Sequence, residues 1–202
     1  MVKVSQLNLQ HSKAASYNLA AQLGKQGTFV ALIQEPRVYK GKTLGRPMNS
    51  HFSSSEGPNK RPRISIYISK NIKAMKLSQF TSEDLTAILT KDINSSLRGN
   101  ICFCSVYMAY NLNILQEFTD LVSFCEINNI PMVIGGDVNA HHLSWGSSDT
   151  NPRGEKLMEL IMNTNLTWVN RDNRSTFVNR RREEVIDLTL TSDIYNLIEN
   201  WH

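Results

Sequence analysis

Short apolar runs of strand length recur along the whole chain, and they restrict the fold more than any other feature of the sequence. A run of about four to eight mostly apolar residues, bounded by turn formers, is typical of a buried β-strand. The predicted strands are Val2 to Leu9, Thr28 to Gln34, Ile64 to Ser69, Leu85 to Thr90, Ile101 to Met108, Met132 to Ile134, Leu166 to Val169 and Val185 to Thr191. Some of them are separated by helical segments, which favours mixed sheets.

Three segments show the spacing of an amphipathic helix. The first follows Ser12, a residue that can cap a helix N-terminus. The second runs from Leu112 to Cys125, and the third starts at Asn151 and Pro152, which suit the N-cap and the first helical position. Each segment has one apolar face, so we expect an α/β protein in which helices cover the faces of the sheets.

The 202 residues, 41% of them hydrophobic, are enough for a domain with a sizeable core. No repeat, low-complexity tract or linker divides the chain, so we expect a single domain over residues 1–202. The longest nearly apolar run, Ile101 to Ala109, is too short to cross a bilayer, and the first ten residues contain no secretory signal. We therefore expect an intracellular protein that has no membrane partner.

The three cysteines, an odd number, fit a reducing compartment. Cys102 and Cys104 alternate on one face of a predicted strand, and no second pair of cysteines stands at the spacing of a zinc site. We therefore predict that both are core residues.

Charge is unevenly distributed along the chain. Residues 1–100 contain 15 Lys and Arg and 5 Asp and Glu, a net charge of +10, whereas residues 101–202 contain 7 and 13, a net charge of −6. If both halves fold into one body, the basic half could hold phosphates while carboxylates of the acidic half hold a cation. A solvated asymmetry without a function is the alternative, and the count by itself does not separate the two.

Polar residues stand at the ends of several apolar strands, where a sheet stops and a pocket can open. Asn8 ends the first strand, and Glu35 closes the second, where Pro36 turns the chain away. In the last long strand, the period of two places Asp187 and Thr189 on one face, opposite the apolar residues. A partly buried carboxylate at this position costs several kcal/mol unless a cation or a donor satisfies it. Asp187 therefore needs a partner.

Asp137 and Asn139 follow a third strand through Gly135-Gly136, a pair that lets the backbone turn tightly or approach a ligand closely. Together with the strand-end residues above, they form a set of hard oxygen ligands without Cys and without ordered His spacing. Such ligands suit Mg²⁺ or Mn²⁺ better than zinc, so phosphoryl chemistry is the leading interpretation. Taken singly, each residue also fits a solvated strand end or a turn.

Other polar stretches are predicted to be loops. Asn49–Pro62 and Asn170–Arg174 are rich in turn formers, so we expect both to be exposed. The adjacent His141 and His142 favour the anchoring of a loop over metal binding. The run Arg180–Arg182 fits a solvated turn and a DNA contact equally well.

Taken in chain order, the strand-end residues form a pattern that resembles the exonuclease/endonuclease/phosphatase superfamily of metal-dependent phosphodiesterases. The motifs that carry this resemblance are Leu7-Asn8-Leu9, Ile33-Gln34-Glu35, Val106-Tyr107, Gly136-Asp137-Val138-Asn139 and Ile186-Asp187. Other stretches are similar to the endonuclease domain of non-LTR retrotransposons, especially the group that targets telomeres and ribosomal DNA. They are Ala31 to Pro36, Asn139 to His142 with Trp145-Gly146, Arg153-Gly154 and Thr176 to Val178.

The resemblance implies a four-layered α/β sandwich, in which two mixed β-sheets pack face to face with helices outside and the site lies at one mouth. In such a site, Glu35 would bind a divalent metal, Mg²⁺ or Mn²⁺, with Asn8 beside it. Asp137 and Asn139 would position the attacking water and the scissile phosphate, and Tyr107 would hydrogen-bond the phosphate.

The resemblance also implies that Asp187 orients a catalytic His, which the family carries in a Ser-Asp-His motif. Here Ser192-Asp193 is followed by Ile194, and the chain reaches His202 without that motif. A fold without its final strand would expose a sheet edge. We therefore expect that the sequence stops before the last strand of the domain.

The implied function is that of a nuclear endonuclease, which nicks double-stranded DNA and leaves a 3′-hydroxyl primer for target-primed reverse transcription. Arg153 and Thr176 stand in family-like motifs and are the expected DNA contacts. We expect a reverse transcriptase in the parent polypeptide, whereas the sequence indicates neither the oligomeric state nor the target site. Two alternatives stay open: a phosphatase or other phosphodiesterase of the same superfamily, and a catalytically silent DNA-binding fragment.

Overall fold

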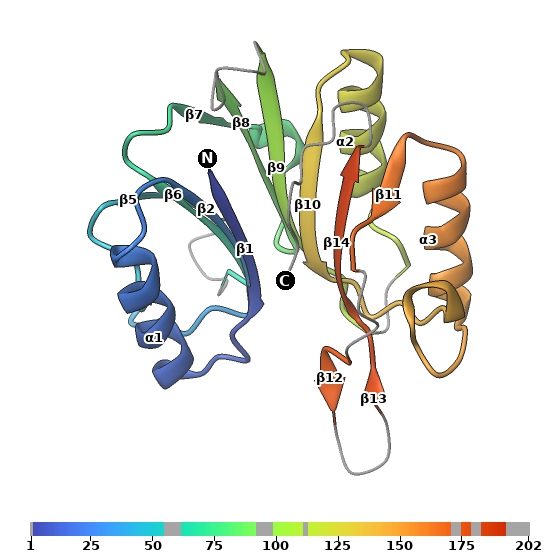
Figure 1. Ribbon diagram of the computed structural model, residues 1–202, viewed down its shortest axis with the longest axis horizontal. Coiled ribbons are helices and arrows are strands. Elements are labelled where there is room, and N and C mark those ends of the chain that lie inside the picture. The colour runs from blue at the N-terminus through green and yellow to red at the C-terminus, as the bar shows by residue number, and fades with distance from the viewer. Residues whose placement is uncertain are drawn as a thin grey trace.

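The computed structural model describes residues 2–54, 62–91, 99–110, 113–170, 175–178 and 183–192, and Figure 1 shows how their helices and strands are arranged. The helices are α1 (Lys13–Gly24), α2 (Gln116–Ile127) and α3 (Pro152–Met162), with 3₁₀ turns η1 (Ser78–Phe80) and η2 (Leu143–Trp145). The strands are β1 (Lys3–Asn8), β2 (Phe29–Gln34), β3 (Val38–Tyr39), β4 (Lys42–Thr43), β5 (Ser50–Ser54), β6 (Ile64–Ser69), β7 (Ala74–Lys76), β8 (Leu85–Lys91), β9 (Asn100–Tyr107), β10 (Met132–Asp137), β11 (Leu166–Trp168), β12 (Phe177–Val178), β13 (Glu183–Glu184) and β14 (Asp187–Ser192). Each strand and helix expected from the sequence is present.

Two mixed sheets form the body of the protein. The first has the order β1-β2-β6-β5, in which β1 and β2 are parallel and the other neighbours are antiparallel. The second has the order β11-β14-β10-β9-β8-β7, in which β9 and β10 are the parallel pair. Two short hairpins, β3-β4 and β12-β13, lie outside these sheets.

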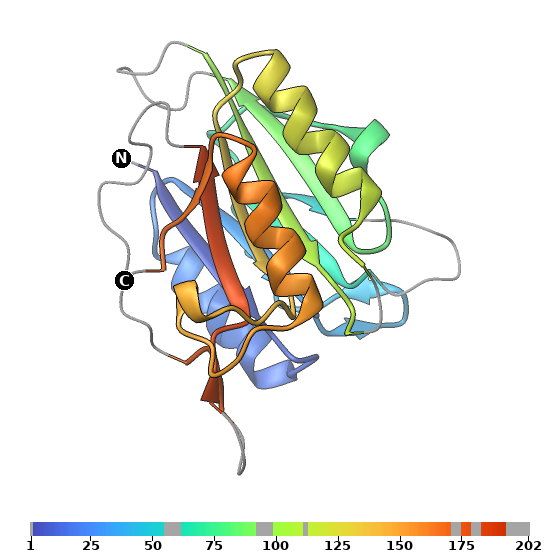
Figure 2. The ribbon, with the colours of Figure 1, turned by 90° about the vertical axis from the view of Figure 1, so that its right-hand side faces the viewer.

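The sheets pack face to face, and helices cover their outer faces (Figure 1 and Figure 2). α1 covers the four-stranded sheet, where Leu19 packs in a cluster with Phe29 and Ile33. α2 and α3 cover the six-stranded sheet and share a larger apolar cluster with it. A third cluster, which includes Leu32 and Phe103, fills the space between the two sheets. The expected four-layered α/β sandwich is confirmed.

Local signals in the sequence account for two of the helix starts. Ser12 caps α1 by accepting a hydrogen bond from the Ala15 amide at 3.2 Å. Asn151 caps α3 by accepting a hydrogen bond from the Gly154 amide at 2.7 Å, and Pro152 occupies the first helical position.

The cysteines Cys102, Cys104 and Cys125 are buried and unpaired, and all three lie in the apolar cluster beneath α2 and α3. Burial raises the pKa of Cys104, which keeps its thiol protonated at neutral pH. The core role expected from the spacing of Cys102 and Cys104 agrees with this position. Within the described residues, no helix is long and apolar enough to cross a membrane.

Some segment ends and one loop differ from expectation. α2 begins at Gln116, whereas Leu112, where the apolar spacing starts, lies outside the described residues. The expected exposed loop Asn49–Pro62 is wrong in its first part, because β5 (Ser50–Ser54) pairs with β6 there. The serines of β5 are small enough to be buried against the sheet, so this strand forms without an apolar pattern. Of the expected loop Asn170–Arg174, only the first residue is described, and it is buried.

Amide side chains cross between the two sheets near the end where β1, β2, β9 and β10 finish. Gln34 Nε2 donates to the Ser105 hydroxyl at 2.9 Å and to the Gly135 carbonyl at 3.0 Å. Gln6 Oε1 accepts a hydrogen bond from the Thr189 hydroxyl at 2.7 Å, as the period of two in β14 allows. Since buried polar groups are costly unless paired, these bonds fix the lateral position of one sheet on the other.

The two glycines that precede Asp137 lie inside β10, so the tight turn considered there is wrong. A Cβ on Gly136 would collide with the side chain of Val106 and lie 2.9 Å from its carbonyl oxygen. A Cβ on Gly135 would lie 2.9 Å from Leu32 Cδ1 of the opposite sheet. The glycines therefore allow β10 to approach both a neighbouring strand and the other sheet.

The substitution Gly136→Ala should lower the free energy of unfolding by about 2–3 kcal/mol, whereas Gly135→Ala should lower it by about 1 kcal/mol. The reason is that the first Cβ meets a rigid backbone carbonyl, and the second meets the ends of flexible side chains. Urea unfolding followed by circular dichroism measures both values. A Gly136→Ala protein as stable as the wild type would contradict this packing.

Candidate active site

The strand-end residues predicted from the sequence gather at one end of the sandwich, which we call the mouth. The strands β1, β2, β9 and β10 finish there, and β6, β8 and β14, which run antiparallel to their partners, begin there (Figure 1). Asn8, Tyr107 and Asp137 are the last residues of β1, β9 and β10, and Asp187 is the first residue of β14. Glu35 directly follows β2. The fold thus brings residues from both parts of the chain into one place.

A direct hydrogen bond joins the two sheets in the mouth. Asn8 Nδ2 donates to Asp137 Oδ2 at 2.8 Å, and Asn8 Oδ1 accepts from the Gln10 amide at 2.9 Å. Asn8 is the register partner of Gln34 across β1 and β2, so Glu35, the next residue, lies beside this contact. The amide side chain of Asn8 therefore aligns the carboxylates of the two sheets.

The backbone of Glu35 is left-handed, with φ 47°, a conformation that is uncommon for a residue other than Gly, Asn or Asp. Its amide donates to the Arg63 carbonyl at 2.7 Å, and its carbonyl accepts from the His11 amide at 2.9 Å. The side chain is 22% exposed, and its Oε1 lies 3.5 Å from His11 Nε2. Backbone strain of this kind is held in place by its surroundings and clusters at functional sites. His11 is a neighbour of Glu35 that the sequence analysis missed.

Burial raises the pKa of both aspartates in the mouth. The pKa of Asp137 rises to about 6, first through burial and also through the charge of Glu35, while hydrogen bonds from Asn8 and the Asn139 backbone oppose the rise. The pKa of Asp187 rises to about 7, first through burial and then through the charge of Asp137. The Oδ1 atoms of both aspartates are buried and have no hydrogen-bond partner among the described residues. Such oxygens fit a divalent cation, whose charge would offset the cost of burying them.

Two charged residues beside Tyr107 were missed by the sequence analysis. Arg63 Nε lies 2.9 Å from Asp84 Oδ1, and the Arg63 guanidinium carbon lies 5.6 Å from the centroid of the Tyr107 ring. The Tyr107 amide donates to the Asp84 carbonyl at 2.8 Å. Burial, and then the charge of Glu35, raise the pKa of Tyr107, so its hydroxyl remains a donor at neutral pH. Arg63 and Asp84 each directly precede a predicted strand, whereas the pattern in the sequence pointed to residues at strand ends.

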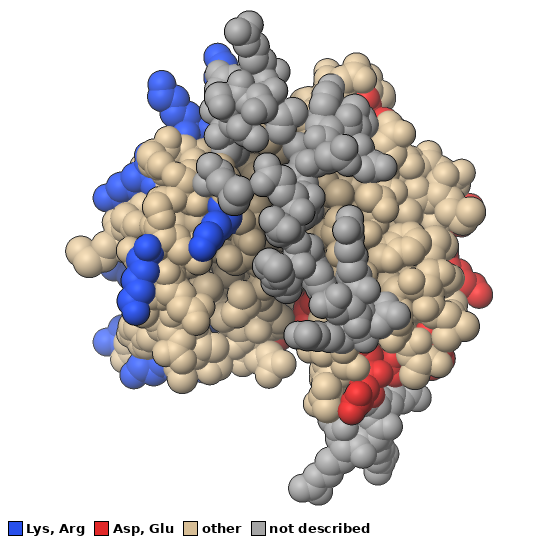
Figure 3. All heavy atoms as spheres, in the orientation of Figure 1, with Lys and Arg blue, Asp and Glu red and all other residues tan. Residues whose placement is uncertain are grey.

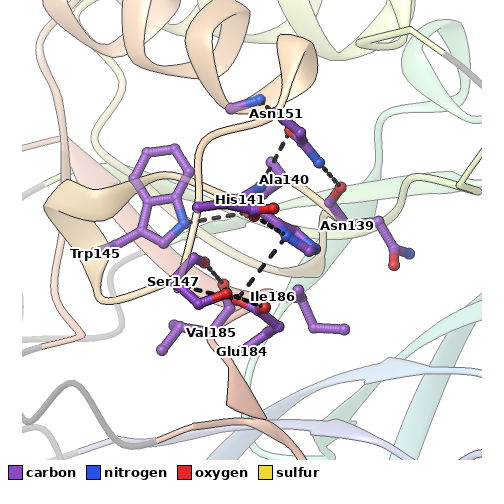
Figure 4. A network of polar contacts seen from close by, with 12 residues as sticks. Asn139, Ala140, His141, Trp145, Ser147, Asn151, Glu184, Val185 and Ile186 are labelled. Carbon is purple, nitrogen blue, oxygen red and sulfur yellow. Dashed lines mark hydrogen bonds and ion pairs between the residues drawn. The ribbon is translucent and has the colours of Figure 1, made fainter. Parts of the chain in front are cut away.

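Polar contacts hold the loop after β10 in place (Figure 4). Asn139, which also has a left-handed backbone with φ 46°, donates from Nδ2 to the Met108 carbonyl at 3.1 Å. Asn151 Nδ2 donates to the Asn139 carbonyl at 3.3 Å, and Asn151 Oδ1 accepts from the His141 amide at 3.2 Å. The residue that caps α3 therefore also fixes the backbone on which Asn139 stands.

The adjacent histidines anchor this loop, in agreement with the sequence analysis. His142 Nδ1 accepts from a backbone amide of η2 at 3.1 Å. His141 Nδ1 lies 2.8 Å from Asp149 Oδ1 and 3.9 Å from Glu184 Oε2, and the ligand atoms of these three residues all lie within 4.8 Å of one another. The Ser148 amide also donates to Glu184 at 2.9 Å. Figure 4 shows His141 and Glu184 in one network, which fastens β13 to the loop.

Arg153 is buried, which disagrees with the expected contact to DNA. Its side chain donates to five backbone carbonyls at 2.6–3.3 Å, those of Met108, Ala109, Tyr110, Val138 and Asn139. The residue as a whole is 8% exposed, so its guanidinium is buried inside the protein. A Cβ on the neighbouring Gly154 would collide with the His141 carbonyl, so a glycine is needed where α3 meets the loop. Arg153 therefore holds the backbone that follows Tyr107 and Asp137.

Thr176 lies beside Asp187. Its hydroxyl oxygen accepts from the Ile186 and Asp187 amides, both at 3.0 Å, and a hydrogen bond from this hydroxyl opposes the rise in the pKa of Asp187. Thr176 therefore positions the start of β14, while its contact with DNA stays a prediction. The run Arg180–Arg182 and the C-terminal residues 193–202 lie outside the described residues.

The uneven charge of the sequence becomes a division between two sides of the molecule. Figure 3 shows Lys and Arg over the side that contains the four-stranded sheet, and Asp and Glu over the opposite side and near β13. The mouth lies where the two sheets meet, so a basic surface stands next to a group of carboxylates.

Comparison with known proteins agrees with this geometry. A family model described as endonuclease-reverse transcriptase matches residues 101–202. The chain belongs to this family. A probable RNA-directed DNA polymerase from transposon BS of Drosophila melanogaster is 23% identical over 136 residues, which are 65% of this chain and 14% of the relative. The chain thus spans only a small part of this relative.

Solved structures show the same fold. The endonuclease domain of TRAS1, a telomere-specific non-LTR retrotransposon, has a TM-score of 0.76 at 22% identity, over 96% of this chain and 86% of that one. The catalytic domain of Xenopus laevis APE2 has a TM-score of 0.66 at 11% identity, over 94% and 82%. The fold is thus that of the exonuclease/endonuclease/phosphatase superfamily, and the resemblance to a retrotransposon endonuclease is confirmed.

Replacement of Arg153 by Lys should lower the free energy of unfolding by about 2–4 kcal/mol, because it leaves several buried carbonyls without a donor. Lys156→Gln, at an exposed position on the same helix, is the control and should change stability by less than about 0.5 kcal/mol. Urea unfolding measures both. An Arg153→Lys protein as stable as the wild type would contradict this role of the guanidinium.

The raised pKa of Asp187 predicts how stability depends on pH. The folded state holds this proton more tightly than the unfolded state, so its stabilising effect is complete below pH 4 and is lost as the pH rises through about 7. In EDTA, Asp187→Asn should therefore be more stable than the wild type at pH 8 by about 1–3 kcal/mol, and the difference should shrink toward pH 4.5.

Thermal unfolding at the two pH values measures this difference, and Asp120→Asn, on the exposed surface of α2, is the control. A difference that grows as the pH falls would show that Asp187 is stabilised in its charged form, contrary to its burial.

Proposed function

We propose that the chain is a divalent-metal-dependent DNA endonuclease of a non-LTR retrotransposon. The observation that carries the proposal is the mouth, where Glu35, Asp137 and Asp187 meet around the inter-sheet contact of Asn8. Family membership and the shared fold support nuclease chemistry in general. The metal, the DNA substrate and the nicking reaction are the proposed parts.

Glu35 and the amide oxygen of Asn8 would hold the metal, Mg²⁺ or Mn²⁺. Both supply hard oxygen atoms at the mouth, and the unpartnered Oδ1 of Asp137 lies at the same place. When bound, the metal would take up negative charge that develops on the phosphate oxygens.

The side chains of the protein would do the remaining work. Asp137, whose pKa of about 6 suits a general base near neutral pH, would accept a proton from the attacking water. Tyr107 would donate its hydroxyl hydrogen to a phosphate oxygen, and Asn139 would fix the phosphate from the other strand end. Asp187 has an unpartnered oxygen that can orient an imidazole, and we propose that the family's Ser-Asp-His motif supplies that group from residues beyond 202.

We further propose that the product is a nick with a 3′-hydroxyl, which primes reverse transcription in the nucleus. The support is the match to a transposon RNA-directed DNA polymerase, of which this chain covers 14%. Double-stranded DNA would be the partner, and a reverse transcriptase would belong to the same parent polypeptide.

Incubation of supercoiled plasmid with the chain, extended by the residues of the parent polypeptide that carry the Ser-Asp-His motif, tests the proposal. We expect nicked circles in Mg²⁺ and none in EDTA, and a loss of at least a hundredfold in Glu35→Gln and in Asp137→Asn. Glu159→Gln, an exposed carboxylate on α3, is the matched control and should nick at the wild-type rate.

A second measurement separates the metal from the reaction. Mg²⁺ should raise the thermal unfolding temperature of the wild type and of Glu159→Gln, but not that of Glu35→Gln, because only the last lacks the proposed ligand. Equal nicking in Mg²⁺ and EDTA would contradict the proposal. Fast hydrolysis of small phosphomonoesters with no nicking would favour a phosphatase, and DNA binding without either reaction would favour a silent binding fragment.

A further inference from the structure

Arg63 touches parts of both sheets at the mouth, and the proposed function gives it no role. Its carbonyl accepts the Glu35 amide at 2.7 Å, which supports the left-handed backbone of the proposed metal ligand. Its Nε lies 2.9 Å from Asp84, and its guanidinium carbon lies over the ring of Tyr107 at 5.6 Å. One residue therefore contacts both the residue that would hold the metal and the residue that would bind the phosphate.

The surroundings of Arg63 favour an anion. The Asp84 side chain is 8% exposed and holds one edge of the guanidinium, while the Arg63 side chain is 35% exposed. Among the described residues, Arg63 makes its side-chain contacts through Nε and the face of the guanidinium, so its terminal nitrogens can still donate to a ligand. A guanidinium offers a planar fork of donors that matches a phosphate, and a fixed one loses less entropy on binding.

The negative charge of the mouth also favours a cationic side chain that contacts the phosphate. Glu35, Asp137 and Asp187 would repel a DNA phosphate, and a single divalent ion offsets only part of their charge. Arg153 is buried behind the loops and donates to backbone carbonyls, so it is not available to the phosphate. Among the described residues, Arg63 is the Arg or Lys that contacts Tyr107.

We propose that Arg63 binds a phosphate of the DNA backbone next to the Tyr107 hydroxyl, and that Asp84 positions its guanidinium for this contact. This inference rests on the proposed function for its substrate class, double-stranded DNA. The alternative is that the ion pair of Arg63 and Asp84 only stabilises the fold.

The first test measures DNA binding in EDTA, where no cleavage interferes. The affinity of the chain for a double-stranded oligonucleotide is followed against salt concentration for the wild type, Arg63→Gln and Arg63→Lys. Arg63→Gln should reduce the slope of log affinity against log salt by about 1, the value for one phosphate contact, and Arg63→Lys should keep the slope.

Lys70→Gln is the matched control. Lys70 is exposed and follows β6 at the end that lies away from the mouth. Its replacement by Gln therefore removes one positive charge about 20 Å from the mouth. It should leave the slope unchanged. A slope for Arg63→Gln equal to that of Lys70→Gln would overturn the proposal.

The second test follows Tyr107 itself. The ultraviolet titration of the chain minus that of Tyr107→Phe reports the pKa of Tyr107, which the charge of Arg63 lowers against the effect of burial. Arg63→Gln should raise this pKa further, and Arg63→Lys should restore part of the difference. An unchanged Tyr107 titration in a folded Arg63→Gln protein would overturn the contact. If Arg63→Gln does not fold, Arg63→Met, which keeps the aliphatic stem, takes its place in both tests.

The outcomes distinguish a failure of the Arg63 contact from a failure of the proposed endonuclease function. A wild type that binds DNA with an Arg63-dependent slope but never nicks plasmid supports the phosphate contact and overturns the endonuclease. A wild type that nicks in Mg²⁺, with an Arg63→Gln slope equal to that of the control, supports the endonuclease and overturns the phosphate contact.

Discussion

The close approach of the two sheets at the mouth is the constraint on which the rest of the structure depends. Gln34 reaches across the interface to Ser105 and to the Gly135 carbonyl, and the absence of a side chain at Gly135 makes room for Leu32 and Gln6 of the opposite sheet. Because the sheets are this close, Asn8 of one can donate to Asp137 of the other at 2.8 Å. A wider spacing would separate the carboxylates, and the site would not exist.

This arrangement lowers the free energy of unfolding of the chain. Asp137 is buried and Asp187 partly buried in the mouth, both with raised pKa values, and Glu35 and Asn139 have left-handed backbones. Such costs persist only where the surrounding structure fixes them. Here Arg153 fixes five carbonyls behind the loops, and Asn151 caps α3 while it supports the Asn139 backbone. The scaffold around the mouth thus stabilises a site that would be unstable by itself.

The sequence predicted the strands and the strand-end carboxylates well, because apolar runs and the residues that interrupt them are local signals. It missed β5, whose buried serines have no apolar pattern, and it missed Arg63 and Asp84, which stand at strand starts. Arg153 was assigned to DNA because it lies in a family-like motif. A motif does not show whether a guanidinium points outward or toward backbone carbonyls, and here the carbonyls of two loops take it up.

By itself, the sequence determined the α/β class, the helix caps and the set of hard oxygen ligands, since each depends on residue types and spacings within a few residues. Only the tertiary structure decided that Glu35 and Asp137 share one mouth, that their neighbour Arg153 is internal, and that Arg63 lies over Tyr107. The physical reason is that these contacts join strands of different sheets, and the distance between such strands is set by how the sheets pack, a property of the whole core.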